Sequence, residues 1–237
     1  MSDTTPLLEL RGLRAAYERI EVVRGVDLEV GEGEVVALLG PNGAGKSTTL
    51  KVIAGLMAPT GGDLLLAGRR VNGARPDDLA RAGVCLIPEG RGIFPNLTVR
   101  ENLRVATHTG RRFADLEGTA FDRFPRLAER RDQVAGTMSG GEQQMLALAR
   151  GLASNPALLL LDELSMGLAP LVVEGLYEKV REIAREGVSI LVVEQFARVV
   201  LDVADRAAIM VRGRITAAGP PETLADELQT AYLGGVS

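Results

Sequence analysis

The sequence predicts an α/β fold in which a mixed, mostly parallel sheet is covered by helices on both faces. Short continuous apolar runs, such as Val35–Leu39 and Leu158–Leu161, are typical of strands that are buried on both faces. Other segments, such as Lys46–Met57 and Leu171–Arg185, have the apolar spacing of a helix. Because strands and helices alternate along much of the chain, we expect parallel strands joined by crossover helices.

The first third of the chain is expected to contain mainly strands and tight turns, including an N-terminal antiparallel β region. The turn Gly31–Glu34 leads into the run Val35–Leu39, and Pro59–Gly62 ends the helix that begins at Lys46. Further strands are predicted at Leu7–Leu10, Val26–Val30, Asp63–Ala67 and Val84–Pro88.

From about residue 95 to residue 154 the pattern becomes helical. Thr98 and Glu101 form a capping-box signature, and Gly141–Ala153 carries its apolar residues on one stripe. Residues 107–120, between these two helices, are predicted to be a loop. We expect this block to form a helical subdomain that is inserted into the core.

The last third returns to alternating strands and helices. Strands are predicted at Leu158–Leu161, Ser189–Val193 and Ala207–Val211, and helices at Leu171–Arg185, Phe196–Ala204 and from Pro221. The chain is therefore predicted to be a single domain, 1–237, with a core of residues 1–94 and 155–237 and a helical subdomain at about 95–154.

Composition and charge exclude some classes of protein. The 237 residues include 31 acidic and 27 basic side chains, a net charge of −4, whereas a dedicated nucleic-acid binder is usually basic. Cys85 is the single cysteine, and the N-terminus lacks a basic segment followed by an apolar run. No apolar stretch approaches the roughly 18 residues of a membrane-spanning helix. We expect a cytoplasmic protein that does not bind nucleic acid and reaches a membrane only through a partner.

The segment Gly40–Ser47 fits the phosphate-binding pattern G-x-x-x-x-G-K-[ST] and lies between a predicted strand and a predicted helix. Its glycines let backbone N–H groups point toward phosphate oxygens at a helix N-terminus, which favours anions. Lys46 adds a positive charge, and the Ser47 hydroxyl is a candidate Mg²⁺ ligand. The alternative is a flexible turn. We predict a phosphate-loop NTPase core that binds ATP and Mg²⁺, with nucleotide contacts from Gly40, Pro41, Asn42, Gly43, Ala44, Gly45, Lys46, Ser47 and Thr48.

Two acidic residues, Asp162 and Glu163, follow the apolar run Leu158–Leu161. This is the end of a parallel strand at which ligands bind in open α/β sheets. Alone, the pair could be a solvated strand end; together with the phosphate loop it predicts a hydrolytic site. Asp162 would hold Mg²⁺, and Glu163 would polarise the attacking water.

A third motif, Ser139-Gly140-Gly141, opens the second helix of the central block. It provides a hydroxyl and free backbone N–H groups, and the alternative is a capped helix start with a glycine turn. With this motif about 90 residues after the phosphate loop, the chain resembles the ATP-binding subunits of ABC transporters over essentially its whole length. The resemblance implies a head-to-tail dimer in which Ser139, Gly140 and Gly141 close over ATP held by the phosphate loop of a second subunit.

Within that family, the sequence resembles most the smaller ATP-binding subunit of branched-chain (hydrophobic) amino acid importers. The segments that carry this resemblance are Ile87–Phe94, Ala135–Gln144, Gly167–Pro170, Val193–Gln195 and Ala231–Gly235. The resemblance implies membrane-embedded permease subunits as partners, a second ABC ATPase subunit in a heterodimer or a homodimer, and, indirectly, a solute-binding protein. It also implies a peripheral location on the inner face of the cell membrane.

Some positions depart from the wider family. Glu89 stands where most members have a glutamine that contacts Mg²⁺, and it is either a charged metal ligand or a surface acid. Gln195 replaces a histidine at the γ-phosphate, where its amide can donate a hydrogen bond but cannot become a cation. Leu164 and Ala169 replace a proline and an aspartate. Tyr17 lies where the family stacks an aromatic ring on adenine, with a core tyrosine as the alternative.

We therefore expect an ATP-hydrolysing subunit of an amino acid importer, in which Glu163 and Gln195 are catalytic. A different class of function is a non-transport ABC-type ATPase with a regulatory or assembly role. A third is a nucleotide-binding module without hydrolysis, in which Asp162 and Glu163 would be idle.

Overall fold

The computed structural model describes residues 5–90, 92–106, 112–195 and 197–233. Its main sheet has six strands in the order β10-β9-β3-β8-β7-β6, and all neighbours are parallel except the β9–β10 pair. The predicted mixed, mostly parallel sheet is confirmed. Its strands are β3 (Val35–Leu39), β6 (Val84–Ile87), β7 (Leu158–Asp162), β8 (Ser189–Glu194), β9 (Arg206–Val211) and β10 (Arg214–Gly219).

The predicted N-terminal antiparallel region is a second sheet, in the order β2-β1-β4-β5. Its strands are β1 (Leu8–Tyr17), β2 (Ile20–Val30), β4 (Gly61–Leu66) and β5 (Arg69–Arg70). The first two are much longer than predicted. A register shift between Leu10 and Leu13, where Gly12 has a φ of +55°, interrupts the alternating pattern and still leaves Leu13 buried.

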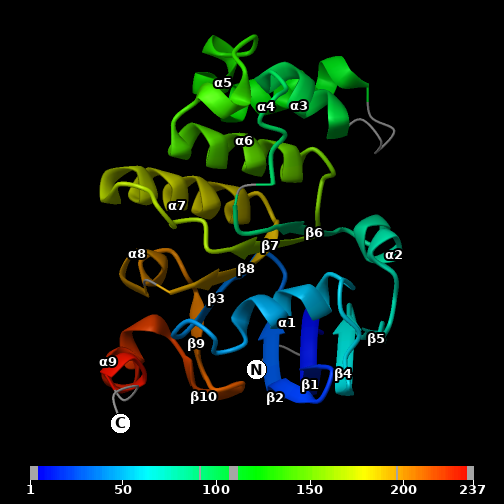
Figure 1. Ribbon diagram of the computed structural model, residues 1–237, viewed down its shortest axis with the longest axis vertical. Helices are drawn as coiled ribbons and strands as arrows, with labels where there is room; N and C mark the ends of the chain where they lie inside the picture. The colour runs from blue at the N-terminus through cyan, green and yellow to red at the C-terminus, as the bar shows by residue number, and fades with distance from the viewer. Residues whose placement is uncertain (1–4, 91, 107–111, 196, 234–237) are drawn as a thin grey trace.

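The apolar strands are continuous because both faces of the main sheet are covered. In β3, Val35, Ala37 and Leu39 belong to one core cluster, whereas Val36 and Leu38 belong to another. The first cluster includes residues of α7 (Pro170–Arg185), and the second includes residues of α1 (Lys46–Ile53) and the antiparallel sheet. Figure 1 shows these layers in order, from the upper helices through the main sheet to α1 and the antiparallel sheet below.

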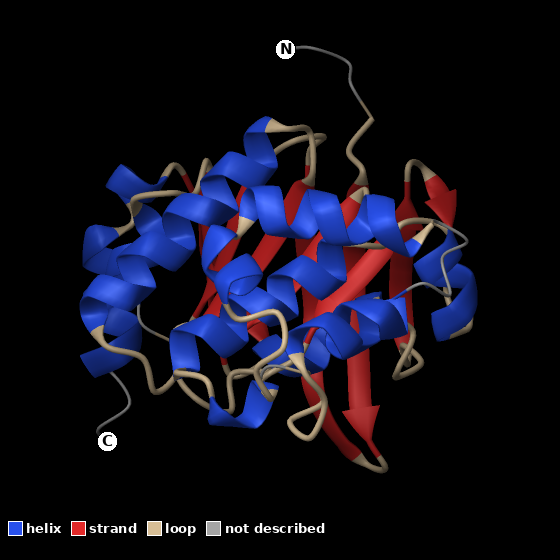
Figure 2. Ribbon diagram, turned by 90° about the horizontal axis from the view of Figure 1, so that it is seen from above, coloured by secondary structure: helices blue, strands red, loops and turns tan. Residues whose placement is uncertain are grey.

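The central helices are α3 (Val99–Val105), α4 (Phe113–Arg123), α5 (Pro125–Glu129) and α6 (Gly140–Leu152), with a 3₁₀ turn at Ala135–Thr137. Figure 2 shows helices stacked in front of the strands. The prediction of a loop at 107–120 was wrong from Phe113 onward, and residues 107–111 lie outside the described chain. Leu116, Ala120 and Phe124 are four residues apart and all buried, so packing of this stripe stabilises α4 despite Gly118.

Several element boundaries also differ from expectation. The helix α1 ends at Ile53 and not at Met57, and α8 (Ala197–Leu201) is shorter than predicted, with Phe196 outside the described residues. The C-terminal helix α9 (Ala225–Leu233) follows a 3₁₀ turn at Pro221–Thr223. The helix α2 (Pro76–Arg81) and the strands β5 and β10 were not predicted. In the described parts of the chain, no helix has both the length and the apolar character that crossing a membrane requires.

Candidate nucleotide-binding and hydrolysis site

The loop 40–45 joins β3 to α1, and close contacts with its neighbours fix its path. A Cβ atom on Gly40 would collide with the backbone oxygen of Met210 in β9. At Gly45, φ is +108°, and a Cβ atom would lie 2.9 Å from Met210 Cε and 3.0 Å from the Val22 carbonyl oxygen. Glycine is therefore required at both positions, and these close contacts fix the backbone path between β3 and α1.

Lys46 is held inside this loop with only 4% of its surface exposed. Its Nζ donates hydrogen bonds to the carbonyl oxygens of Gly40, at 2.9 Å, and Pro41, at 3.3 Å. The same atom lies 3.6 Å from Oε1 of Glu163. A buried cation needs such partners, and here they fix the ammonium group at the centre of the loop, where an anion would meet it.

Ser47 and Asp162 form the second part of the site. The Ser47 hydroxyl, in the first turn of α1, donates a hydrogen bond of 2.9 Å to Oδ1 of Asp162 at the end of β7. Burial raises the pKa of Asp162; the charges of Glu163 and Glu89 add to this effect, and Ser47 and Lys46 oppose it. Glu89, which is exposed, therefore lies near enough to influence this carboxylate. A divalent cation at this place would stabilise the ionised form.

These donors fit a metal ion that arrives with phosphate groups. In the part of the chain that the structure describes, no group of three or more His, Cys, Asp or Glu side chains could hold a metal by itself. Mg²⁺ commonly binds one or two protein oxygens and takes its remaining ligands from substrate phosphates and water. Ser47 and Asp162 supply that kind of sparse oxygen set beside a loop shaped for phosphate.

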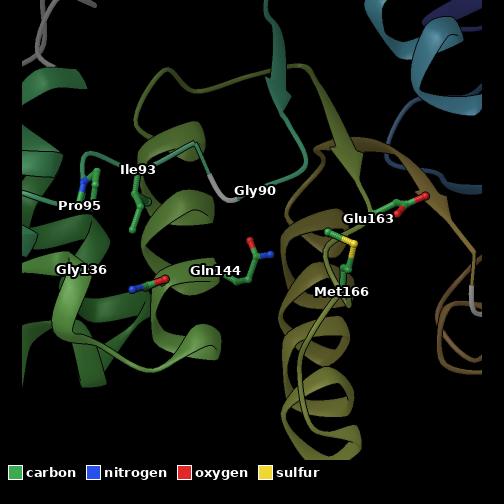
Figure 3. A pocket seen from close by; sticks show the side chains of 8 residues that line it. Gly90, Ile93, Pro95, Gly136, Gln144, Glu163 and Met166 are labelled. Atoms are coloured by element: carbon green, nitrogen blue, oxygen red, sulfur yellow. The ribbon is translucent and has the colours of Figure 1, made fainter.

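Glu163 begins a turn with an uncommon backbone conformation. Its φ is +48°, a left-handed value that a non-glycine residue rarely adopts, and its N–H donates to the Val193 carbonyl oxygen at 2.9 Å. A cleft of about 350 Å³ opens beside it. In Figure 3, Glu163 and Met166 lie on one side of this cleft, and Ile93, Pro95 and Gly136 lie on the other. The cleft gives the Glu163 side of the site access to solvent.

The segment Ser139–Gly141 is ordered as a capped helix start. Ser139 and Glu142 form a reciprocal capping box, in which the Ser139 hydroxyl donates to Glu142 Oε2 at 2.8 Å. Burial would raise the pKa of Glu142, but hydrogen bonds from Ser139 and the ion pair with Arg130 outweigh it and lower that pKa. A Cβ atom on Gly141 would collide with Val172 of α7. Both the capping and the helix packing therefore depend on this motif.

The structure brings only part of the predicted site together. The loop, Asp162 and Glu163 meet at one edge of the main sheet, and Gln195 follows β8 at the same edge. The start of α6, by contrast, lies beyond α7 and the sheet from α1 in Figure 1, so one chain does not join Ser139–Gly141 to its own phosphate loop. Tyr17 ends β1 and is 45% exposed, which excludes the alternative of a core tyrosine.

A contact that sequence reasoning missed comes from the C-terminal helix. The Tyr232 hydroxyl, in α9, donates a hydrogen bond to the carbonyl oxygen of Gln195. Burial raises the pKa of Tyr232, a hydrogen bond with the Gly40 backbone opposes that rise, and the charges of Glu194 and Glu163 add to it. Tyr232 is therefore a protonated donor between the loop and Gln195. Local sequence patterns carry no signal for a contact between residues so far apart.

Comparisons with known proteins agree with this arrangement. The family model described as "ABC transporter" matches residues 23–165. High-affinity branched-chain amino acid transport ATP-binding protein BraG of Pseudomonas aeruginosa is 42% identical over 92% of this chain and 96% of its own length. BraF of the same organism, with the same description, is 33% identical over 97% of this chain and 98% of its own.

A relative with a different transport role is also similar. Lipopolysaccharide export system ATP-binding protein LptB of Haemophilus influenzae is 32% identical over 96% of this chain and 97% of its own. Among solved structures, the ADP conformation of MJ1267, an ATP-binding cassette of an ABC transporter, matches the fold with a TM-score of 0.88. That match covers 98% of this chain and all of MJ1267 at 24% identity. The chain therefore belongs to the ABC transporter family and is an ATPase subunit of such a transporter.

Proposed function

We propose that this subunit drives the import of branched-chain or other hydrophobic amino acids. The main support for amino acid import is the 42% sequence identity to BraG along nearly the whole of both chains. The identity to the lipopolysaccharide export protein LptB is lower, at 32%. Selectivity for the solute would reside in other chains, so this site supplies energy to the transporter and does not recognise the solute.

The geometry at the sheet edge supports a division of roles in ATP hydrolysis. Backbone N–H groups of residues 40–48 and the Lys46 ammonium would hold the phosphates, and Tyr17 would stack on adenine. Ser47 and Asp162 would hold Mg²⁺, with Glu89 as a further oxygen ligand. Bound Mg²⁺ would neutralise charge that develops on the phosphates.

Hydrolysis itself would depend on Glu163 and Gln195. Glu163 would accept a proton from the attacking water, and the Gln195 amide would donate a hydrogen bond to the γ-phosphate. Ser139, Gly140 and Gly141 would contact the nucleotide held by a neighbouring subunit. The single-domain organisation, with a core and a helical subdomain, lets closure on ATP move the two parts relative to each other.

The implied assembly contains permease subunits and a second ATPase subunit. BraG and BraF are both described as branched-chain amino acid transport ATP-binding proteins, and both occur in Pseudomonas aeruginosa. Two such ATPases in one organism support a heterodimer over a homodimer. The permeases would dock near Glu89–Phe94 and place this subunit on the inner face of the membrane, and a solute-binding protein would join from the other side.

Co-purification from native membranes tests this function. We expect the tagged chain to recover permease subunits and a second ABC ATPase, and deletion of its gene to abolish uptake of radiolabelled leucine. Recovery of soluble partners alone, with normal uptake, would favour the non-transport alternative. Loss of outer-membrane lipopolysaccharide with normal uptake would assign the chain to export.

A further inference from the structure

A buried carboxylate that the proposed mechanism does not use lies next to Gln195. Glu194 ends the strand β8 and is 1% exposed, after a run of apolar residues, Ile190–Val193. No lysine or arginine of the described chain forms an ion pair with it. Because burying an unpaired carboxylate is costly, its position calls for strong hydrogen-bond donors.

Ser165 and Tyr177 are these donors. The Ser165 N–H donates to Oε1 of Glu194 at 2.9 Å, and the Ser165 hydroxyl donates to Oε2 at 2.8 Å. The Tyr177 hydroxyl, from α7, donates to Oε1 at 2.6 Å. Burial and the adjacent Glu194 raise the pKa of Tyr177 well above its ordinary value, so this hydroxyl remains a donor.

Two of these three hydrogen bonds come from Ser165, in the turn after Glu163. Ser165 lies two residues beyond Glu163, and the Glu163 N–H is itself bonded to the Val193 carbonyl oxygen. Glu163 and the turn after it are therefore hydrogen-bonded to two successive residues of β8, Val193 and Glu194. Gln144 of α6 adds a third point through a hydrogen bond of 3.1 Å to the Leu164 carbonyl oxygen. These hydrogen bonds hold Glu163 in a left-handed backbone conformation that a non-glycine residue disfavours.

We infer that Glu194 is a positioning residue for ATP hydrolysis: its carboxylate holds the turn after Glu163 against β8, the strand that directly precedes Gln195. This inference rests on the proposed roles of Glu163 and Gln195. The distance between a water-activating carboxylate and a γ-phosphate contact must be held closely, since a displacement of about 1 Å can reduce a rate about 10²-fold. Glu194 provides that constraint, because it directly precedes Gln195 in the chain and accepts two hydrogen bonds from Ser165 in the turn after Glu163.

Two substitutions separate the acceptor function of Glu194 from its charge. In Glu194→Met, a side chain of similar length cannot accept hydrogen bonds, and three donors lose their partner. In Glu194→Gln, the amide oxygen can still accept from Ser165 N–H and Tyr177, and the Ser165 hydroxyl can accept from the amide nitrogen. We expect kcat for ATP to fall at least about tenfold in Glu194→Met, with KM changed less than about threefold, and Glu194→Gln to restore kcat to within about threefold of wild type.

Ser189→Ala is the matched control on the same strand. Ser189 is also 1% exposed, and its hydroxyl accepts a hydrogen bond of 2.9 Å from the Gly33 N–H, at the opposite end of β8. We expect this variant to lower the melting temperature without lowering kcat. Tyr177→Phe removes one donor with little change of shape; it should lower kcat about two- to tenfold and carries the test if Glu194→Met does not fold.

Hydrogen exchange provides a readout that does not depend on hydrolysis. The amide of Ser165 should exchange faster in Glu194→Met than in wild type, and at the wild-type rate in Glu194→Gln and Ser189→Ala. The inference is overturned if the Ser165 amide of folded Glu194→Met exchanges at the wild-type rate, or if kcat of that variant is within about twofold of wild type. It is also overturned if kcat of Glu194→Gln is as low as that of Glu194→Met. Absence of ATPase activity in the wild-type chain would instead overturn the proposed function. Hydrogen exchange at the Ser165 amide would still show whether Glu194 holds the turn against β8.

Discussion

Replacing Glu163 with glutamine tests the proposed base most directly. The substitution keeps the side-chain size, and the hydrogen bond that holds the turn uses the backbone N–H, so Glu163→Gln should leave the turn in place. It removes the proton acceptor, which typically contributes 10²- to 10⁴-fold to a rate. We therefore expect kcat for ATP to fall at least about 10²-fold, an increase of roughly 3 kcal/mol in the activation free energy.

Binding of ATP should survive the same change. The Glu163 carboxylate lies 3.6 Å from the Lys46 ammonium, so the amide removes a counter-charge from the loop, but it also removes a negative charge that would repel phosphates. Equilibrium dialysis with a labelled ATP analogue should give a Kd equal to or below that of wild type, and phosphate release should measure kcat. Glu178→Gln, an exposed change on α7, is the control. Turnover within about threefold of wild type in Glu163→Gln would assign the base to another residue.

Other residues give separate predictions. The pKa of Glu142 is lowered in the folded state, so its stabilising contribution is complete above its ordinary value of 4.5 and is lost as the pH falls through the folded-state pKa. Urea unfolding at pH 7 and at about pH 4 should therefore show a smaller pH dependence in Glu142→Gln than in wild type. Tyr232→Phe removes the donor to the Gln195 carbonyl oxygen and should lower kcat about two- to tenfold, measured by phosphate release, without unfolding the chain. Leu116→Ala, in the buried stripe of α4, should lower the free energy of unfolding by about 2–5 kcal/mol in the same urea assay. An unchanged midpoint in Leu116→Ala would mean that α4 does not pack as described.

Elements with a strong local signal could be predicted from the sequence. The strands β3 and β7 are buried on both faces, so their residues form unbroken apolar runs. The capping boxes that begin α3 and α6 place donor and acceptor three residues apart, which a linear pattern records directly. The phosphate loop is equally local, because the backbone of eight consecutive residues creates it.

Elements that depend on distant packing could not be predicted. The helix α4 contains Gly118 and Thr119, which weaken its local preference, and burial of Leu116 and Ala120 against other helices compensates. The strand β10 has alternating exposure and is recognisable only from its pairing with β9. The bonds of Tyr232 to Gln195 and of Tyr177 to Glu194 likewise join segments whose approach is a result of the fold.

The register of the main sheet explains why the site residues meet. Leu39, the last residue before the phosphate loop, pairs with Glu194, and Asp162 pairs with Val193. The three strands β3, β8 and β7 are adjacent and parallel, so they end within one residue of each other at the same edge. A slip of one residue would turn each buried side chain to the opposite face, which the apolar residues on both faces strongly disfavour. The packing of the core therefore sets the position of Asp162 against Ser47 as well as the stability of the sheet.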